Sequence, residues 1–188
     1  GRFTLQPEGS FEATQAYLDR TNVLETTFET DSGTMTVTDF MPVLDGDSVE
    51  EPRLRGLYRR VSCTEGSVDL SVEFSPRFDY ARSETTVDRT SEGVLATNDD
   101  RQVGLVSPVD LRVVDGVGNG DTARGGERLS AGDERWFLVR YTMHAPSGPE
   151  ACERLLEETV EYWREWAHSC EESECHFGGT GHDHVVRS

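Results

Sequence analysis

The stretch TNVLETTFETDSGTMTVTDFM, residues 21–41, decides the fold. Two segments rich in Thr, Val and Phe flank Asp31-Ser32-Gly33, a short polar connection that contains a glycine. This pattern predicts a β-hairpin with a loop of three or slightly more residues. In the first arm Leu24, Thr26 and Phe28 share one side, and charged or hydroxyl residues occupy the other. We therefore expect an antiparallel sheet with one buried and one solvated face.

Further strand signals recur roughly every 8–12 residues, with turn residues between them. Extended segments are predicted at Phe3–Leu5, Phe11–Leu18, Leu54–Cys63, Val68–Phe74, Arg77–Tyr80, Thr85–Arg89, Gly93–Thr97, Val103–Ser107, Leu111–Val114 and, as a final hairpin, Arg128–Leu129 with Arg135–Met143. Turns are predicted at Glu65-Gly66, at Gly116–Asp121 and at Gly125-Gly126. This spacing favours an antiparallel β-sandwich or barrel, a mainly β fold.

The pattern changes after Pro149. Residues 150–170, EACERLLEETVEYWREWAHSC, have apolar and aromatic side chains at helical spacing. The members of this stripe are Leu155, Leu156, Thr159, Tyr162, Trp163 and Trp166. We predict one C-terminal amphipathic helix that lays the stripe across the sheet or onto something beyond the chain end.

The charge balance is unusual. The chain has 36 acidic and 18 basic residues, a net charge of −18, and every basic side chain in that count is Arg. Acidic residues occur in all segments, so the whole surface is acidic rather than one tail. About 1 M salt, with a Debye length of roughly 3 Å, would screen the resulting repulsion. We predict a halophilic protein, the alternative being an ordinary acidic protein that lacks Lys. The absence of a basic stripe argues against a nucleic-acid partner.

The cysteine and apolar content bear on the compartment. Four cysteines in 188 residues are too few for a disulfide scaffold, so we predict a reducing, cytoplasmic setting. No run approaches 18 apolar residues, and we expect no membrane span in this sequence.

A Cys/His cluster near the C-terminus is the first candidate for a metal site. Its members are Cys170, Cys175, His176, His182 and His184, with His168 nearby. Thiolates and imidazoles are the ligands that zinc prefers, but the spacing Cys-x4-Cys-His-x5-His-x-His matches no zinc pattern. We interpret the cluster as incidental histidines in a flexible insertion and predict neither a metal nor a cofactor.

Catalytic groups cannot be selected from this sequence. Among 36 acidic residues no glycosidase-like pair of carboxylates can be singled out. His144 is the only histidine before residue 168, and no G-x-S-x-G motif is present, which argues against a nucleophilic triad. The GVGNGD segment, residues 116–121, lacks the Lys of a phosphate loop and is interpreted as a turn. We assign no catalytic residue, and the substrate-binding residues stay unknown.

Two sets of side chains could bind a ligand, but each has a simpler interpretation. Trp163 and Trp166 could stack on sugar rings, yet at this spacing on an amphipathic helix we expect core packing. The arginines could bind an anion, but pairing with Glu and Asp across strands is expected in so acidic a chain. They are Arg53, Arg55, Arg59 and Arg60.

Several motifs, taken in order, resemble one enzyme family. They are Tyr17-Leu18-x-x-Thr21-Asn22-Val23-Leu24-Glu25-Thr26, Val37-Thr38-Asp39-Phe40-Met41-Pro42, Arg53–Val61, Phe74-Ser75-Pro76-Arg77-Phe78-Asp79-Tyr80, Tyr162-Trp163-x-x-Trp166 with Cys170, and Val186-Arg187-Ser188. The chain resembles the N-terminal region of glycoside hydrolase family 15, most closely its prokaryotic glucoamylase and trehalase-like branch. The matches extend over nearly the whole chain.

This resemblance implies a β-sandwich of the supersandwich type, as in galactose mutarotase, over residues 1–148, lacking its first strands. Residues 149–188 would be a linker helix and the start of an (α/α)6 catalytic domain that this chain does not contain. The family's two catalytic glutamates lie in that domain and cleave α-glucosidic bonds with inversion. The expected function is thus a non-catalytic domain of an α-glucoside hydrolase, with that catalytic domain as its partner.

Two other functions stay open at this point. A stand-alone carbohydrate-binding module would show an exposed row of aromatic residues on one sheet face. A mutarotase-like epimerase would need His and Glu projecting from strands as acid and base.

Overall fold

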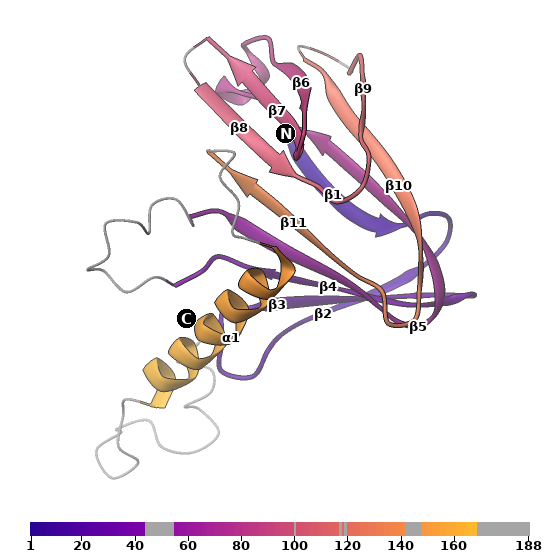
Figure 1. Cartoon of the computed structure of the whole chain (residues 1–188), viewed down its shortest axis with the longest axis vertical. Coiled ribbons are helices and arrows are strands. Elements are labelled where there is room, and N and C mark those ends of the chain that lie inside the picture. Colours follow the sequence, from indigo (N-terminus) through magenta and orange to yellow (C-terminus); the bar gives the residue numbers. More distant parts are fainter. Residues whose placement is uncertain (44–54, 100, 117, 119, 142–147, 169–188) are drawn as a thin grey trace.

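Eleven strands and one α-helix make up the described part of the chain (Figure 1). The structure is a computed structural model that describes residues 1–43, 55–99, 101–116, 118, 120–141 and 148–168. The strands are β1 (Arg2–Pro7), β2 (Glu12–Tyr17), β3 (Leu24–Thr30), β4 (Gly33–Phe40), β5 (Leu57–Ser75), β6 (Thr86–Thr90), β7 (Gly93–Asn98), β8 (Arg101–Val106), β9 (Arg112–Val114), β10 (Thr122–Ser130) and β11 (Glu134–Arg140). Helix α1 spans Pro149–His168, and a short 3-10 turn spans Asp79–Ala81.

Strand β5 joins two antiparallel sheets. Its second half pairs with β1 and β10, and β10 pairs in turn with β9, which forms the first sheet. Its first half pairs with β4 and β11 in the second sheet, whose order is β2-β3-β4-β5-β11-β8-β7-β6. The mainly β, antiparallel sandwich predicted from the sequence is confirmed, as is the single helix that follows it.

The sequence predicts a turn at Glu65-Gly66, and this prediction is wrong. Strand β5 is continuous over 19 residues, and a β-bulge shifts its register against β4 between Thr34 and Met35. Before the bulge Val61 and Cys63 face the core, whereas after it the core-facing side chains have even numbers, from Val68 to Phe74. Gly66 has φ +64, so the glycine that suggested a turn instead lets the strand bend from one sheet into the other.

The hairpin predicted around residue 32 is confirmed as β3 and β4, but its loop is Asp31-Ser32, shorter than the loop of three or more residues that the sequence predicts. Thr30 pairs with Gly33 at the turn, and Leu24 pairs with Asp39 at the far end. Thr26 and Phe28 are buried on one face, as the alternation predicts. The opposite face is not solvated throughout, because Phe40 is buried on the side of the sheet that α1 covers.

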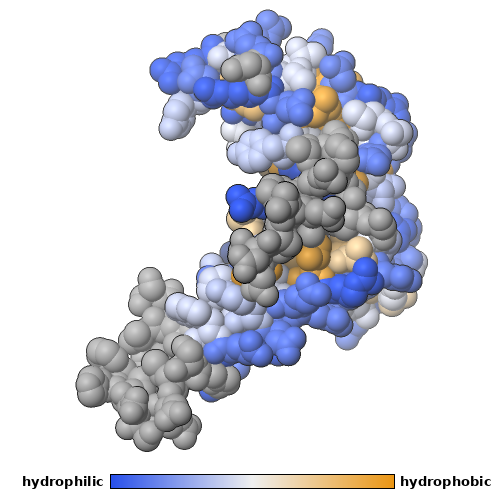
Figure 2. All heavy atoms as spheres, turned by 60° about the vertical axis from the view of Figure 1, so that its left-hand side comes forward, coloured by the Kyte–Doolittle hydropathy of each residue, from blue (hydrophilic) through white to orange (hydrophobic). Residues whose placement is uncertain are grey.

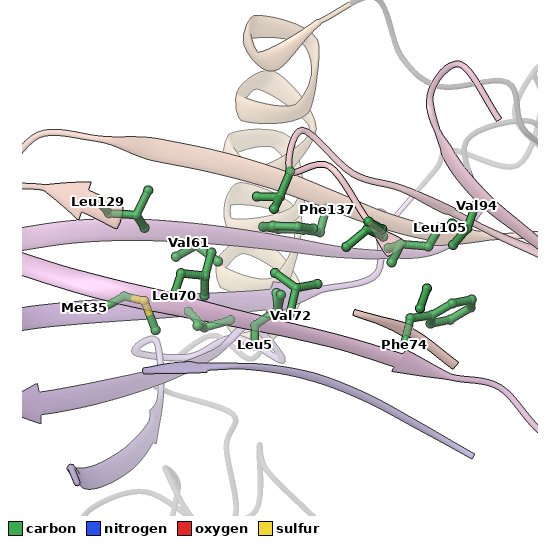
Figure 3. Packing of buried hydrophobic residues seen from close by; sticks show 14 of the residues in the cluster. Leu5, Met35, Val61, Leu70, Val72, Phe74, Val94, Leu105, Leu129 and Phe137 are labelled. Carbon is green, nitrogen blue, oxygen red and sulfur yellow. The ribbon is translucent and has the colours of Figure 1, made fainter. Parts of the chain in front are cut away.

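A single apolar core lies between the two sheets (Figure 3). Its fully buried members include Met35 from β4, Val61 and Leu70 from β5, Leu105 from β8 and Phe137 from β11. Both sheets contribute to this cluster, which we call the inner core, but the exposed edge strand β2 does not. Because the alternation of period two places these side chains on the inner faces, the inner core follows directly from the strand pattern.

Two further predictions about local structure are corrected. Residues 77–80 do not continue a strand after Pro76: Asp79 and Tyr80 have positive φ in the 3-10 turn, and Tyr80 is 92% exposed. Gly125 and Gly126 form no turn. They lie within β10 and pair with Val72 and Ser71 of β5. A Cβ at Gly125 would lie 2.5 Å from the backbone oxygen of Asp110, so glycine here permits a close approach of the backbone.

The surface is largely polar. The face shown in Figure 2 is mostly hydrophilic, with apolar residues visible near its middle and towards its top. None of the described helices is both long enough and apolar enough to span a membrane.

Candidate functional site

Helix α1 packs on the outer face of the second sheet and forms a second apolar cluster there, which we call the outer layer. Proline at the first position of α1 suits a helix start, where a missing N–H costs nothing. The helix contributes Cys152, Leu155 and Leu156. The sheet contributes Val23, Phe40, Tyr58, Trp136 and Leu138. The prediction that the helix lays its stripe across the sheet is confirmed for this N-terminal half.

Polar contacts fix the helix to the rest of the domain at two places, one on β5 and one on the segment after β4. One nitrogen of the Arg60 guanidinium donates to both carboxylate oxygens of Glu153, at 2.9 and 3.0 Å. The same guanidinium lies over the Trp136 ring, 5.9 Å from its centre. The hydroxyl of Thr159 accepts a hydrogen bond from the Val43 backbone N–H at 3.3 Å. These contacts set the position of α1 along the sheet.

A cavity of about 430 Å³ opens between the first turn of α1 and strands β8 and β11. Its lining includes Val106, Trp136, Leu138, Pro149 and Cys152, together with the charged residues Glu92, Glu134 and Arg135. Most of the cavity surface is therefore apolar, with charged groups from the sheet.

Arg140, two residues beyond Leu138, is buried on the same outer face of β11. Only 2% of it is exposed, yet none of its guanidinium nitrogens has a hydrogen-bond partner in the described part of the chain. A Cβ at Gly56 would lie 2.7 Å from the Cγ of Arg140, so this glycine leaves room for the side chain. Tyr58, Cys152 and Glu92 are the groups that act on Arg140 electrostatically.

Burial controls the ionisation of this group of side chains. Burial raises the pKa of Tyr58 to about 12, against the opposing effect of the Arg140 charge. Burial likewise raises the pKa of Cys152 to about 11, again opposed by Arg140. For Arg140 itself, burial lowers the pKa of the guanidinium. At neutral pH the phenol and the thiol are therefore uncharged, and neither neutralises Arg140.

The C-terminal half of α1 ends in an exposed aromatic group. Trp163 contacts both Tyr162 and Trp166 edge to face, with ring centres 5.7 Å apart in each pair. Trp166 lies seven residues after the buried Thr159 and so on the same side of the helix, but it is 54% exposed. Figure 1 shows the end of α1 extending past the strands. The prediction of core packing is therefore wrong for Trp166 in this chain, because the sheet does not reach it.

The residues singled out as metal candidates lie mostly outside the described part of the chain. Cys170, Cys175, His176, His182 and His184 are not described, and neither is His144. His168 ends helix α1. Among the described residues no group of three or more His, Cys, Asp or Glu could hold a metal ion. The described cysteines, Cys63 and Cys152, are free and buried, and burial raises the pKa of both thiols.

The arginines of β5 bear out the expected pairing with acidic residues. Arg59 forms a bidentate ion pair with Asp39, the residue opposite it on β4, with nitrogen–oxygen distances of 2.7 and 3.0 Å. Arg60 pairs with Glu153 from the helix rather than with a neighbouring strand. Arg55 is exposed, and Arg53 lies outside the described residues.

A stand-alone carbohydrate module would need a row of aromatic side chains on one sheet face. The exposed aromatics of the described residues are Phe11, Tyr17, Tyr80, Tyr141, Tyr162 and Trp166. They come from the two ends of β2, the 3-10 turn, the residue after β11 and the helix, so no sheet face carries such a row among the described residues.

Sequence reasoning missed Arg140. An arginine between Val139 and Tyr141 near a strand end suggests a solvated cation. One signal was available. Trp136, Leu138 and Arg140 are two residues apart, so they share one face of a strand, and the two apolar residues indicate that this face is buried.

The fold and this site define a β-sandwich domain with a helix packed on its outer face. The family model of trehalase-like N-terminal domains matches residues 1–145. The chain therefore belongs to the trehalase-like N-terminal domain family, and the resemblance seen in the sequence is confirmed at this level.

Relatives support the assignment. A trehalase from Thermoplasma volcanium is 27% identical over 193 positions that cover 100% of this chain and 29% of that protein. A trehalase from Mycolicibacterium smegmatis is 30% identical over 186 positions, 88% of this chain and 27% of that protein. The chain thus spans less than a third of the length of these curated relatives. A solved structure of a putative kojibiose phosphorylase from the human microbiome aligns with 99% of this chain and 27% of its own, at TM-score 0.44 and 8% identity, a likeness too weak to bear on function.

Proposed function

We propose that this chain is the non-catalytic N-terminal domain of a family 15 glycoside hydrolase that cleaves trehalose. Its role is to hold the catalytic domain, an (α/α)6 barrel with an inverting mechanism, through the outer layer and the end of α1. The family match over residues 1–145 supports the domain assignment, and the names of the relatives support trehalose over other α-glucosides.

The observation that carries the docking role is the exposed end of α1. Trp166 and Tyr162 are 54% and 39% exposed, although the helix face that leads to them is buried two turns earlier. Large aromatic side chains are enriched where proteins bury a contact surface, because they bring much apolar area at low entropic cost. The occupant of this surface is the catalytic domain that would follow α1.

The activity test compares the 188-residue chain with the longer parent protein. The parent should release glucose from trehalose, and the 188-residue chain alone should release none. Glucose release by this chain alone would overturn the non-catalytic assignment, and a parent inactive on trehalose but active on maltose would overturn the choice of substrate.

The docking test uses Trp166→Ala. In the parent this substitution should lower the melting temperature and the trehalase activity, because it removes buried interface area. In the 188-residue chain it should change the free energy of unfolding by less than about 0.5 kcal/mol. Tyr80→Ala is the matched control, since Tyr80 is exposed in the 3-10 turn and should affect neither protein. Equal effects of the two substitutions in the parent would contradict the docking role.

The parent is also proposed to work in a salt-rich cytoplasm. The net charge of −18 and the lack of Lys support the salt adaptation, and the cysteines of the described residues, both free and buried, suit a reducing compartment. The melting temperature should rise steeply between about 0.1 and 1 M KCl, over which the Debye length falls from roughly 10 to 3 Å. A melting temperature that does not depend on KCl would contradict this.

A further inference from the structure

Strand β2 is exposed on both of its faces, although it is paired in a sheet of a sandwich. All six of its residues are exposed, whereas Phe28 of β3 and Met35 of β4 are buried in the inner core. β2 forms one edge of the second sheet (Figure 1), and within the described part of the chain it pairs with β3 alone. β2 is therefore a paired strand that lacks a covering layer.

The cause is a difference in width between the two sheets. On this side of β5 the second sheet continues through β4, β3 and β2, but the first sheet continues through β1 alone among the described residues. Strand β1 contacts β3. Because neighbouring strands lie about 4.8 Å apart, the place opposite β2 is one strand spacing beyond β1. The edge of β1 that borders this place pairs with no strand of the described chain.

One side of β2 continues the inner face of the second sheet. The register identifies this side, because Ala13 lies opposite the core residue Phe28 and residues opposite each other share a face. The Phe11 and Phe28 rings meet edge to face with centres 5.2 Å apart, and the Gln15 amide donates to the Thr26 hydroxyl at 3.0 Å. The members of this side, which we call the β2 row, are Phe11, Ala13, Gln15 and Tyr17.

The β2 row is uncharged in a chain of which 29% of the residues are charged. Phe11 is 36% and Tyr17 49% exposed. The opposite side of β2 and β3 carries Glu12, Glu25 and Glu29, as expected for a solvated face. An exposed row that combines two aromatic rings with no charge is typical of a surface that another segment covers. A second copy of this chain is disfavoured as the cover, because two chains of net charge −18 repel each other.

We propose that a β-strand of the parent protein, from outside residues 1–188, pairs with the free edge of β1 and covers the β2 row. This rests on the proposed function, since the strand belongs to the parent. Over two thirds of the length of the matched trehalases lies outside the matched region, so such relatives have chain to supply it. The strand brings apolar side chains to Phe11 and Tyr17 and backbone hydrogen bonds to β1. Because it belongs to the same polypeptide, its high effective concentration offsets the charge repulsion.

The first experiment compares amide hydrogen exchange of β1 in the 188-residue chain and in the parent, at one fixed salt concentration. In the parent, the β1 N–H groups that point away from β5 should exchange more than about tenfold more slowly, because the added strand accepts their hydrogen bonds. Equal exchange rates in the two proteins would overturn the proposal. Protection that increases with protein concentration would identify a second copy as the cover and would overturn it as well.

The second experiment places a charge on either side of β2. Ala13→Asp lies in the β2 row, and Thr14→Asp, one residue further and on the opposite side, is the matched control. Both positions are exposed, so in the 188-residue chain both variants should keep the melting temperature within about 2 °C. In the parent, Ala13→Asp alone should lower the melting temperature by several degrees, because burying an unpaired carboxylate is costly. Equal shifts of the two variants in the parent contradict the proposal.

A crystal structure of the parent identifies the strand directly. A segment from outside residues 1–188 should form backbone hydrogen bonds of about 2.9 Å to β1 and contact Phe11 and Tyr17. Solvent, a second molecule or a segment from within residues 1–188 at this place would refute the added strand. A parent that is inactive on trehalose but has the strand in place refutes the substrate alone, whereas an active parent with an uncovered β2 row refutes the strand alone.

Discussion

The two faces of the second sheet are buried in different ways. The inner core is built from apolar side chains and free Cys63, drawn from both sheets, and Phe137 and Met35 are fully buried in it. The outer layer, under α1, contains a phenol, an unpaired guanidinium and a cavity, and the helix that covers it ends with Trp166 half in solvent. Two sheets that face each other complete one core by themselves, whereas one helix covers only part of a sheet face. The inner core should therefore dominate stability and the outer layer should respond to charge, pH and partners.

The largest expected effect comes from the inner core. Phe137→Ala should lower the free energy of unfolding by about 3–5 kcal/mol, because it removes a fully buried ring between the sheets. Urea unfolding followed by circular dichroism measures the change. The comparison breaks down if Phe137→Ala costs no more than Trp166→Ala at the exposed end of α1.

The outer layer should show a pH dependence that comes from its buried phenol. The pKa of Tyr58 is about 12 in the folded chain against 10 for a free phenol, so the folded state holds this proton more tightly than the unfolded state does. The associated stability is fully present below pH 10 and is lost between pH 10 and 12, by about 2–3 kcal/mol.

Tyr58→Phe removes this ionisation while keeping the ring. The variant should show a smaller loss of stability than the wild type between pH 10 and 12 in urea unfolding at several pH values. The raised pKa of Cys152, about 11, acts from about pH 9 to 11 in both proteins and cancels in the comparison. Parallel pH profiles for the two proteins would disprove the role of the phenol.

The bend of β5 sets the positions of both layers. Gly66→Ala should cost about 2 kcal/mol, because Gly66 has φ +64 and an added Cβ would overlap the backbone oxygen of Ser32. Gly9→Ala is the matched control: Gly9 also has positive φ, but nothing lies within 4 Å of the added Cβ. If both substitutions cost the same in urea unfolding, strain in φ alone explains the effect and the close contact contributes nothing.

The smallest effect concerns the attachment of the helix. Glu153→Gln should cost about 1 kcal/mol, because the ion pair with Arg60 is only partly buried. A double-mutant cycle with Arg60→Met isolates the interaction, and Glu158→Gln on the exposed side of α1 is the control. A coupling energy near zero would show that apolar contacts alone hold the helix.

Much of the fold could be predicted because its signals are local. The β3–β4 hairpin and the amphipathic helix follow from periodicity and turn residues over a few positions each. The predicted final hairpin is wrong, because β10 and β11 pair with different halves of β5 in different sheets and not with each other. The errors at Gly66 and Gly125 have one cause. A glycine indicates a position where the backbone adopts an unusual conformation or lies very close to another segment. Such positions occur in a β-bulge or a crowded strand as well as in a turn.

The sequence by itself determined the alternation that builds the inner core, the amphipathic stripe of α1 and the pairing of Arg59 with acidic neighbours. Only the tertiary structure decided that β5 passes through both sheets, that Trp166 lies beyond the sheet and that Arg140 is buried without a hydrogen bond. The physical reason is the sequence separation of the interacting residues. Periodicity is a local property, and it specifies which side of a strand or helix is apolar. What covers that side, and whether a charge on it finds a partner, depends on segments far apart in the chain.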